Sequence, residues 1–147
     1  LKVDLGAKLD GYCSDITRTS WIGEEPDEEF LAIWRVVADA QQRAIEQVRA
    51  GVEAKKIDEA ARQVIERAGY GQYFVHGLGH GVGLEVHEGP RIAATSEDVL
   101  QAGHVVTIEP GIYLPGKFGV RIEDLVVVED DGCRVLTNAA KVEVWQA

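Results

Sequence analysis

The sequence predicts an α+β domain in which a mainly antiparallel sheet carries flanking helices. Strand-like segments begin the chain, two amphipathic helical patterns follow, and further strand-like segments end it. Strands joined by short turns pair antiparallel, and strands grouped apart from helices indicate α+β rather than alternating architecture. The chain has 147 residues, enough for one domain with a hydrophobic core. We therefore expect residues 1–147 to form a single domain.

The first element is a β-hairpin formed by residues 1–9 and 12–22. The dipeptide Asp10-Gly11 between them is a strong signal for a two-residue hairpin turn. β-branched and aromatic side chains after this turn support the second strand.

Two helices are expected next, over residues 26–50 and 57–68. Pro26 suits the first turn of a helix, and the acidic residues after it suit the positive end of the helix dipole. Apolar residues recur at helical spacing in both segments, and Gly51 and Gly69 suit the helix ends. We interpret the apolar stripes as core.

The second half of the chain begins with residues 73–90, which are rich in Gly and His. Strand-like segments follow at about 104–113, 118–129 and 133–136, with Gly116 between the first two. No internal repeat or linker divides this half from the first.

The chain is acidic, with a formal charge of −10. Binding to phosphate needs a basic face, so we expect no nucleic-acid partner. No apolar run approaches the length of a membrane span, and no targeting segment is visible, so we expect no membrane partner. Cys13 and Cys133 are most simply free thiols in a reducing cytoplasm, with a disulfide or a thiolate ligand as the alternatives.

The first hairpin places two carboxylates on one face. If Asp10-Gly11 is the turn, Gly6 lies opposite Asp15, and Asp4 shares the face of Gly6. Asp4 and Asp15 are then diagonal neighbours, about 7–8 Å apart. Two Asp residues on one strand face are unusual unless they bind a cation, the alternative being two solvated carboxylates.

A second carboxylate pair is symmetric about Gly116. An odd-length loop centred there puts Glu109 directly opposite Glu123. Opposed like charges destabilise a hairpin unless a cation lies between them. Arg121 has the same parity as Glu123 and could either orient a ligating carboxylate or neutralise it.

Three of the four histidines fall in the segment VHGLGHGVGLEVHEGP. A phosphate-binding loop is disfavoured because no Lys-Ser/Thr follows the glycines, which more simply let the backbone crowd a site. We interpret His76, His80 and His87 as one metal ligand with two histidines that handle substrate and protons. We assign no role to His104.

The donor set consists of carboxylates and one imidazole. Such donors suit Mn²⁺, Co²⁺, Fe²⁺ or Zn²⁺. A catalytic zinc usually takes three protein ligands, so five favour two ions about 3.5–4 Å apart. The candidate ligands are Asp4, Asp15, His80, Glu109 and Glu123.

Five motifs, VDLG, YCSDITRT, HGLGHGVG, TIEPG and RIED, resemble in order and spacing those of the pita-bread metallopeptidases. That family includes methionine aminopeptidase, aminopeptidase P and prolidase. The resemblance implies the pita-bread (creatinase/aminopeptidase) fold with a curved sheet. YCSDITRT, GLEVHEGP and IEPGIY resemble the proline-specific branch more than methionine aminopeptidase.

The resemblance also implies roles for individual residues. Asp15 and Glu123 would bridge two divalent ions, most simply Mn²⁺, with Asp4 on one ion. His80 and Glu109 would complete the other ion's ligands. His76 and His87 match substrate-facing histidines of the family, whereas Glu109 also matches a carboxylate that shuttles protons.

The implied reaction is hydrolysis of the bond between an N-terminal residue and proline by a metal-bridging hydroxide. The substrate would be a proline-containing peptide, and the full-length protein would be a homodimer. The alternatives are a methionine aminopeptidase-type exopeptidase and a non-catalytic binding module on the same fold. The chain begins without Met inside a strand-like segment, so we expect an N-terminally truncated, partial catalytic domain that is inactive alone.

Overall fold

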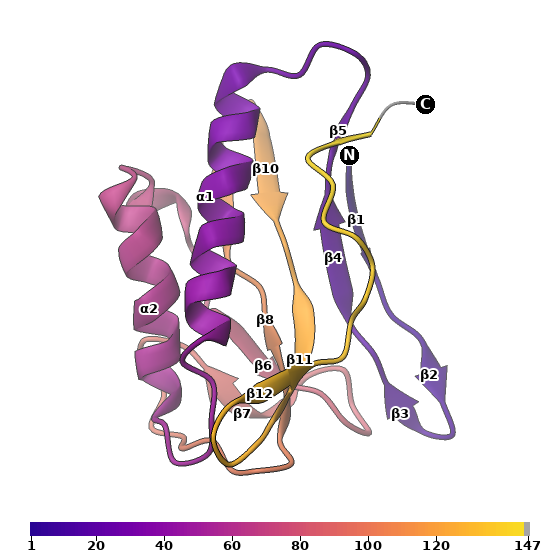
Figure 1. The fold of residues 1–147 in the computed structure, drawn as a ribbon, viewed down its shortest axis with the longest axis vertical. Coiled ribbons are helices and arrows are strands. Elements are labelled where there is room, and N and C mark those ends of the chain that lie inside the picture. The colour runs from indigo at the N-terminus through magenta and orange to yellow at the C-terminus, as the bar shows by residue number, and fades with distance from the viewer. Residues whose placement is uncertain (146–147) are drawn as a thin grey trace.

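The computed structural model describes residues 1–145 as an α+β arrangement (Figure 1). In chain order the elements are β1 (Lys2–Leu5), β2 (Lys8–Leu9), β3 (Tyr12–Cys13), β4 (Ile16–Thr19), β5 (Trp21–Ile22), α1 (Glu28–Ile45), α2 (Ala54–Arg67), η1 (Gly71–Tyr73), β6 (Gly79–Gly81), β7 (Glu88–Ile92), β8 (Val105–Ile108), β9 (Gly111–Leu114), β10 (Phe118–Arg121), β11 (Asp124–Val128), β12 (Cys133–Val135) and β13 (Val144–Trp145).

The main sheet has five antiparallel strands in the order β12-β11-β8-β6-β7. β8 and β11 continue into the hairpin β9–β10, and the two pairs share one register. The mainly antiparallel sheet of the sequence prediction is therefore confirmed. Outside it, β5 and β13 form a short parallel pair that the sequence did not predict.

The N-terminal hairpin pairs β1 with β4, and its tip pairs β2 with β3. Asp10 and Gly11 both have positive φ, 49° and 90°, as a two-residue turn matching the strand twist requires. The predicted turn is therefore confirmed. The Cys13 amide donates to the Gly83 carbonyl at 2.8 Å, which joins the hairpin tip to the loop after β6.

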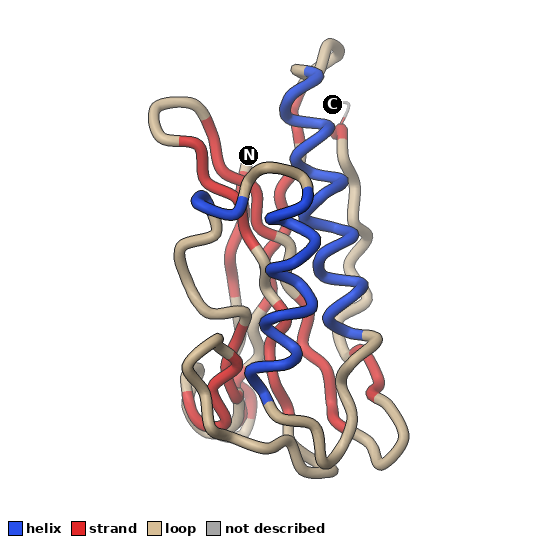
Figure 2. Tube along the Cα trace, turned by 90° about the vertical axis from the view of Figure 1, so that its left-hand side faces the viewer, coloured by secondary structure: helices blue, strands red, loops and turns tan. Residues whose placement is uncertain are grey.

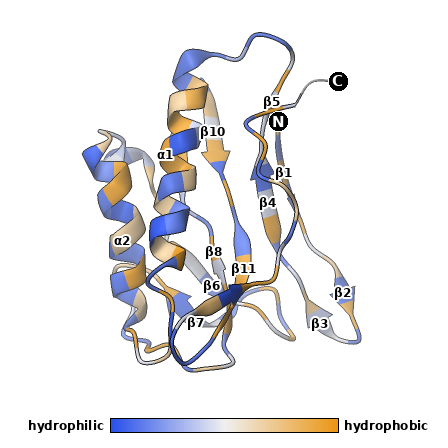
Figure 3. Cartoon of the chain, viewed as in Figure 1, coloured by the Kyte–Doolittle hydropathy of each residue, from blue (hydrophilic) through white to orange (hydrophobic). Residues whose placement is uncertain are grey.

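α1 and α2 pack against each other and cover one face of the sheet (Figures 1 and 2). Both helices carry separate apolar and polar faces, as their coloured bands show (Figure 3). The helices and the sheet share one core whose fully buried side chains include Ile33, Val37, Ile57, Ile65, Ile108, Ile112 and Val126.

The helices differ from the prediction at their ends. α1 begins after Asp27, whose Oδ1 accepts a 3.1 Å hydrogen bond from the Phe30 amide, and it stops at Ile45 rather than near residue 50. Beyond Ile45 the amides of Gln47 and Val48 bond to carbonyls three residues back, and those of Ala50 and Gly51 bond to carbonyls outside the helix. α2 begins at Ala54, three residues before the predicted start.

The predicted strands are broken at the candidate ligands. The segment 104–113 divides at Glu109-Pro110, and 118–129 divides at Ile122-Glu123. Proline has no amide hydrogen and interrupts the hydrogen-bond ladder there.

The glycine-rich segment contains β6 and the start of β7, which were not predicted. A Cβ on Gly79 would lie 2.0 Å from the Thr107 carbonyl oxygen, and one on Gly81 would lie 2.1 Å from that of Gly89. These glycines therefore let neighbouring strands pack closely, and the prediction that they let the backbone crowd a site stays a prediction.

Neither helix in residues 1–145 is long and apolar enough to cross a membrane. Cys13 and Cys133 are free thiols, as expected.

Candidate metal centre

The N-terminal hairpin brings Asp4 and Asp15 to one face in the predicted register. Asp4 on β1 pairs with Thr17 on β4, and Asp15 directly precedes β4. The two carboxylates differ in environment, because Asp15 is buried whereas the Asp4 side chain is 45% exposed.

The second carboxylate pair is also where the sequence predicts it. Ile108 pairs with Asp124 and Gly111 pairs with Arg121, so the unbroken register sets Glu109 opposite Glu123. Their backbone amides point away from each other. The Glu109 amide donates to the Leu78 carbonyl at 2.9 Å, and the Glu123 amide donates to the Thr17 carbonyl at 3.0 Å.

His80 reaches this centre from β6. Its Nε2 lies 3.2 Å from Glu109 Oε1 and 3.9 Å from Asp15 Oδ2. Its Nδ1 lies 3.0 Å from the Gly81 carbonyl oxygen, to which it donates. A backbone carbonyl on one ring nitrogen leaves the other to bind a metal, the usual arrangement for ligating histidines.

Three overlapping groups of side chains have ligand atoms within 4.8 Å of one another. The groups are Asp15 with His80 and His87, His80 with Glu109 and Glu123, and Asp4 with Asp15 and Glu123. All five predicted ligands therefore converge in one place. These side chains line an open cleft of about 1090 Å³.

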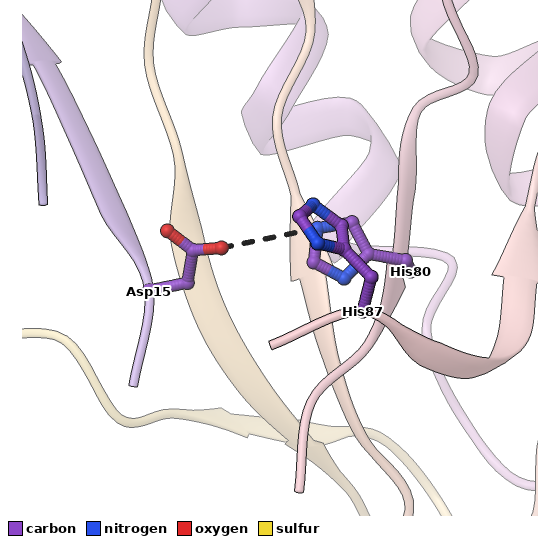
Figure 4. Close-up of side chains that lie close together, drawn as sticks. All are labelled: Asp15, His80 and His87. Atoms are coloured by element: carbon purple, nitrogen blue, oxygen red, sulfur yellow. Dashed lines mark ion pairs between the residues drawn. The ribbon is translucent and has the colours of Figure 1, made fainter. Parts of the chain in front are cut away.

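His87, predicted to face the substrate, also lies close enough to Asp15 and His80 to share a metal ion with them. Its ring centroid is 4.2 Å from that of His80 (Figure 4). Asp15, directly before β4, faces both imidazoles. His87 can therefore contact either a cation or a substrate in the cleft.

His76 and Arg121 meet at the Tyr113 hydroxyl. His76 Nε2 lies 2.8 Å from this oxygen, and Arg121 Nη1 donates to it at 3.1 Å. Arg121 also bonds to the Asp4 carboxylate, and its Nε lies 3.8 Å from Glu109 Oε2. Both roles considered for Arg121 fit this geometry, because it bonds to the Asp4 carboxylate and places positive charge near that of Glu109.

Negative charge is incompletely balanced at the centre. Burial, together with the Glu109 carboxylate, raises the pKa of Glu123 from its ordinary 4.5 to about 7. Burial and the charge of Asp4 also raise the pKa of Asp15. Such shifts mean that burial and the neighbouring carboxylates oppose ionisation. A divalent cation would supply the missing positive charge, so the residues present fit a metal site.

The pKa shifts of His80 and Glu109 instead favour the charged form of each group. Burial alone would lower the pKa of His80, but its contacts with Glu109 and the Gly81 carbonyl raise it. Burial alone would raise the pKa of Glu109, but hydrogen bonds from His80 and Thr107 lower it. When His80 is protonated, these two groups form an ion pair, and a cation could replace the proton between them.

Two hydroxyl groups that bond to the candidate ligands were not predicted from the sequence. Thr17 Oγ1 donates to Glu123 Oε2 at 2.6 Å, and Thr107 Oγ1 donates to Glu109 Oε1 at 2.9 Å. Strand parity could have found them, because each lies two residues from a candidate ligand. The same rule finds Tyr113, four residues after Glu109.

An ion pair on α2 that the sequence did not indicate holds the His76 segment. Asp58 is fully buried and accepts two hydrogen bonds from Arg62, at 2.9 and 3.0 Å, and one from the Leu78 amide at 3.1 Å. Arg62 donates in turn to the carbonyls of Phe74 and His76, each at 3.0 Å. The backbone on both sides of His76 is therefore tied to α2.

His104 lies outside the three ligand groups found in residues 1–145. Its Nδ1 accepts a 3.2 Å hydrogen bond from the Gln101 amide.

Comparison with known proteins gives relatives over nearly the whole chain. An Xaa-Pro dipeptidase of Pyrococcus furiosus is 50% identical over 139 residues, 95% of this chain and 40% of that protein. Among solved structures, an X-Pro aminopeptidase from Thermotoga maritima has a TM-score of 0.94 at 46% identity, covering 99% of this chain and 40% of that one. An Xaa-Pro dipeptidase from Bacillus anthracis has a TM-score of 0.95 at 45% identity, covering 99% and 41%.

The chain spans about 40% of the length of these relatives. The structural matches confirm the predicted pita-bread fold. Residues 1–130 match the sequence profile of Metallopeptidase family M24. The chain therefore belongs to metallopeptidase family M24.

Proposed function

We propose that the protein carrying this chain hydrolyses the peptide bond between an N-terminal residue and proline. The convergence of four carboxylates and His80 in one cleft carries this proposal. The relatives named Xaa-Pro dipeptidase and X-Pro aminopeptidase support a proline-specific substrate. In this proposal residues 1–147 form a single domain, the metal-binding part of the catalytic domain.

Five side chains would hold two divalent cations, most simply Mn²⁺. These side chains are Asp4, Asp15, His80, Glu109 and Glu123. When bound, such a pair of ions lowers the pKa of a water molecule and polarises the scissile carbonyl.

The chain's own groups would orient the substrate and move the proton. Glu109 accepts a proton from the attacking water and returns it to the proline nitrogen, with Thr107 fixing one of its oxygens. His87 lies beside His80, where it can donate to the developing oxyanion. His76 contacts the substrate from the wall of the cleft and is oriented by Tyr113.

Turnover by the intact protein tests this function. Metal-stripped protein is reloaded with Mn²⁺, Co²⁺ or Zn²⁺ and supplied with Xaa-Pro, Xaa-Pro-Xaa and Met-Ala-Xaa peptides. We expect metal-dependent cleavage before proline, and the two proline substrates separate dipeptidase from aminopeptidase activity. Preferred release of Met would favour the methionine aminopeptidase alternative, and Mn²⁺ uptake without cleavage would favour a binding module. Homodimer formation is a further prediction, measured by light scattering.

A further inference from the structure

Gln41 is a polar side chain in the apolar core beneath the glutamate pair. It lies on the buried face of α1 and is 0% exposed. Its Nε2 donates to two backbone carbonyls of the sheet, Ile108 at 2.9 Å and Ile122 at 3.2 Å. Each of these residues directly precedes a candidate ligand, Glu109 or Glu123.

The Ile122 carbonyl needs this donor because of the sequence opposite it. The amides of Glu109 and Glu123 point outward, so these residues form a non-hydrogen-bonded pair of the antiparallel ladder. The next pair, Pro110 and Ile122, should exchange hydrogen bonds, since the register continues unbroken past it. Proline has no N–H to donate. The carbonyl of Ile122 therefore lacks its donor from the ladder, and Gln41 supplies one from the helix.

The contact lies where two features of the sequence weaken the pairing of the strands. Opposed carboxylates repel each other, and the direct ladder is interrupted at the same place. The Gln41 Nε2 donates to a carbonyl of each strand there. Its Oε1 has no protein partner among residues 1–145. The fold therefore uses the donor side of this amide and leaves its acceptor side unpaired.

We propose that Gln41 is a positioning residue for the metal centre. Its amide takes the place of the missing Pro110 N–H and holds Glu109 and Glu123 at the spacing that cations require. This inference rests on the proposed function, because it assigns a purpose to the glutamate spacing.

Metal binding by the intact protein tests the inference without relying on activity. Gln41→Met keeps the length of the side chain and removes its donor. Gln42→Met makes the same change one residue away, where the side chain is exposed and bonds to Glu46. Mn²⁺ is titrated calorimetrically into each metal-stripped protein, and the thermal midpoint of unfolding is recorded in parallel. We expect Gln41→Met to raise the Kd about 10-fold or more, as loss of a ligand-orienting group does, and Gln42→Met to leave it unchanged.

A second substitution checks the backbone mechanism. Pro110→Ala restores an N–H opposite Ile122, so the double variant Gln41→Met/Pro110→Ala should fold and bind Mn²⁺ within about 3-fold of Pro110→Ala alone, well short of the loss expected when a ligand is misplaced. This comparison also stands if Gln41→Met alone does not fold. Unchanged affinity in Gln41→Met, or a double variant that stays unfolded or weak, overturns the inference. No Mn²⁺ uptake by the unaltered protein overturns the proposed function with it.

Discussion

Thr17 donates a 2.6 Å hydrogen bond to Glu123, and both side chains are buried. The hydroxyl comes from β4 of the N-terminal hairpin, and the carboxylate comes from the residue directly before β11, 106 residues later. This bond fixes the orientation of the carboxylate and opposes the rise of its pKa. The hairpin therefore contributes to the centre beyond its own two Asp residues.

Thr17→Val should weaken metal binding. The substitution removes the hydroxyl donor while nearly keeping the shape of the side chain, so Glu123 loses its orientation and holds its proton more tightly. We expect the Kd for Mn²⁺ to rise about 10-fold, more at about pH 6 than at about pH 8 because metal displaces the proton. Calorimetric titration at both pH values measures this. Thr95→Val, at an exposed position, is the control, and equal affinities would contradict the prediction.

Glu123→Gln should change how the stability of the metal-free protein depends on pH. The native pKa of about 7 exceeds the ordinary 4.5, so between these values the native state binds more protons than the unfolded state. The contribution of Glu123 is thus fully present below about pH 4.5 and is lost as the pH rises through about 7. This loss is at most about 3 kcal/mol of unfolding free energy. Urea unfolding across this range should show a shallower decline for Glu123→Gln, and parallel curves would refute the assignment.

Asp15→Ala and His80→Ala should each abolish both Mn²⁺ uptake and Xaa-Pro cleavage in the intact protein. Each residue belongs to two of the three ligand groups, so its loss removes a ligand atom from both of those groups. Calorimetry and a peptide turnover assay at limiting metal measure the two effects. His104→Ala, which removes a histidine outside these groups, should retain both properties. Near-normal turnover in either ligand variant would sink the proposed centre.

Arg62→Met should destabilise the fold and loosen the His76 segment. It leaves the fully buried Asp58 without its ion partner and frees the carbonyls of Phe74 and His76. We expect a loss of about 3 kcal/mol or more of unfolding free energy. Arg67→Met, on the exposed face of the same helix, should cost little. Similar denaturation midpoints for the two variants would show that the buried pair is not important for stability.

Local patterns predict much of this centre because it is built from two hairpins. The turn at Asp10-Gly11 and the symmetry about Gly116 set the register, and strand parity then sets which carboxylates share a face. The approach of His80 to both pairs could not be predicted in the same way. It depends on the pairing of β6 with β8, and turn chemistry and parity do not specify which distant strands pair.

Contacts from the helices were missed for a related reason. Gln41 occupies a buried position of α1 where the helical pattern would place an apolar residue. Its hydrogen bonds to two backbone carbonyls are known only from the packed structure. Asp58 and Arg62 read as an ordinary i,i+4 pair on a helix surface, whereas Asp58 is fully buried. Burial of a polar residue on an amphipathic helix is set by the partner it packs against, which the periodic pattern leaves open.

The outward-pointing amides of Glu109 and Glu123 make the centre a branch point of the chain's hydrogen bonding. The Glu109 amide donates to the segment that carries His80, and the Glu123 amide donates to the N-terminal hairpin. The first strand of this hairpin is exposed throughout. A cation held at this branch would restrain the hairpin against local opening. Slowed amide exchange in β1 and β4 would therefore report metal occupancy from a hairpin that lies outside the main sheet.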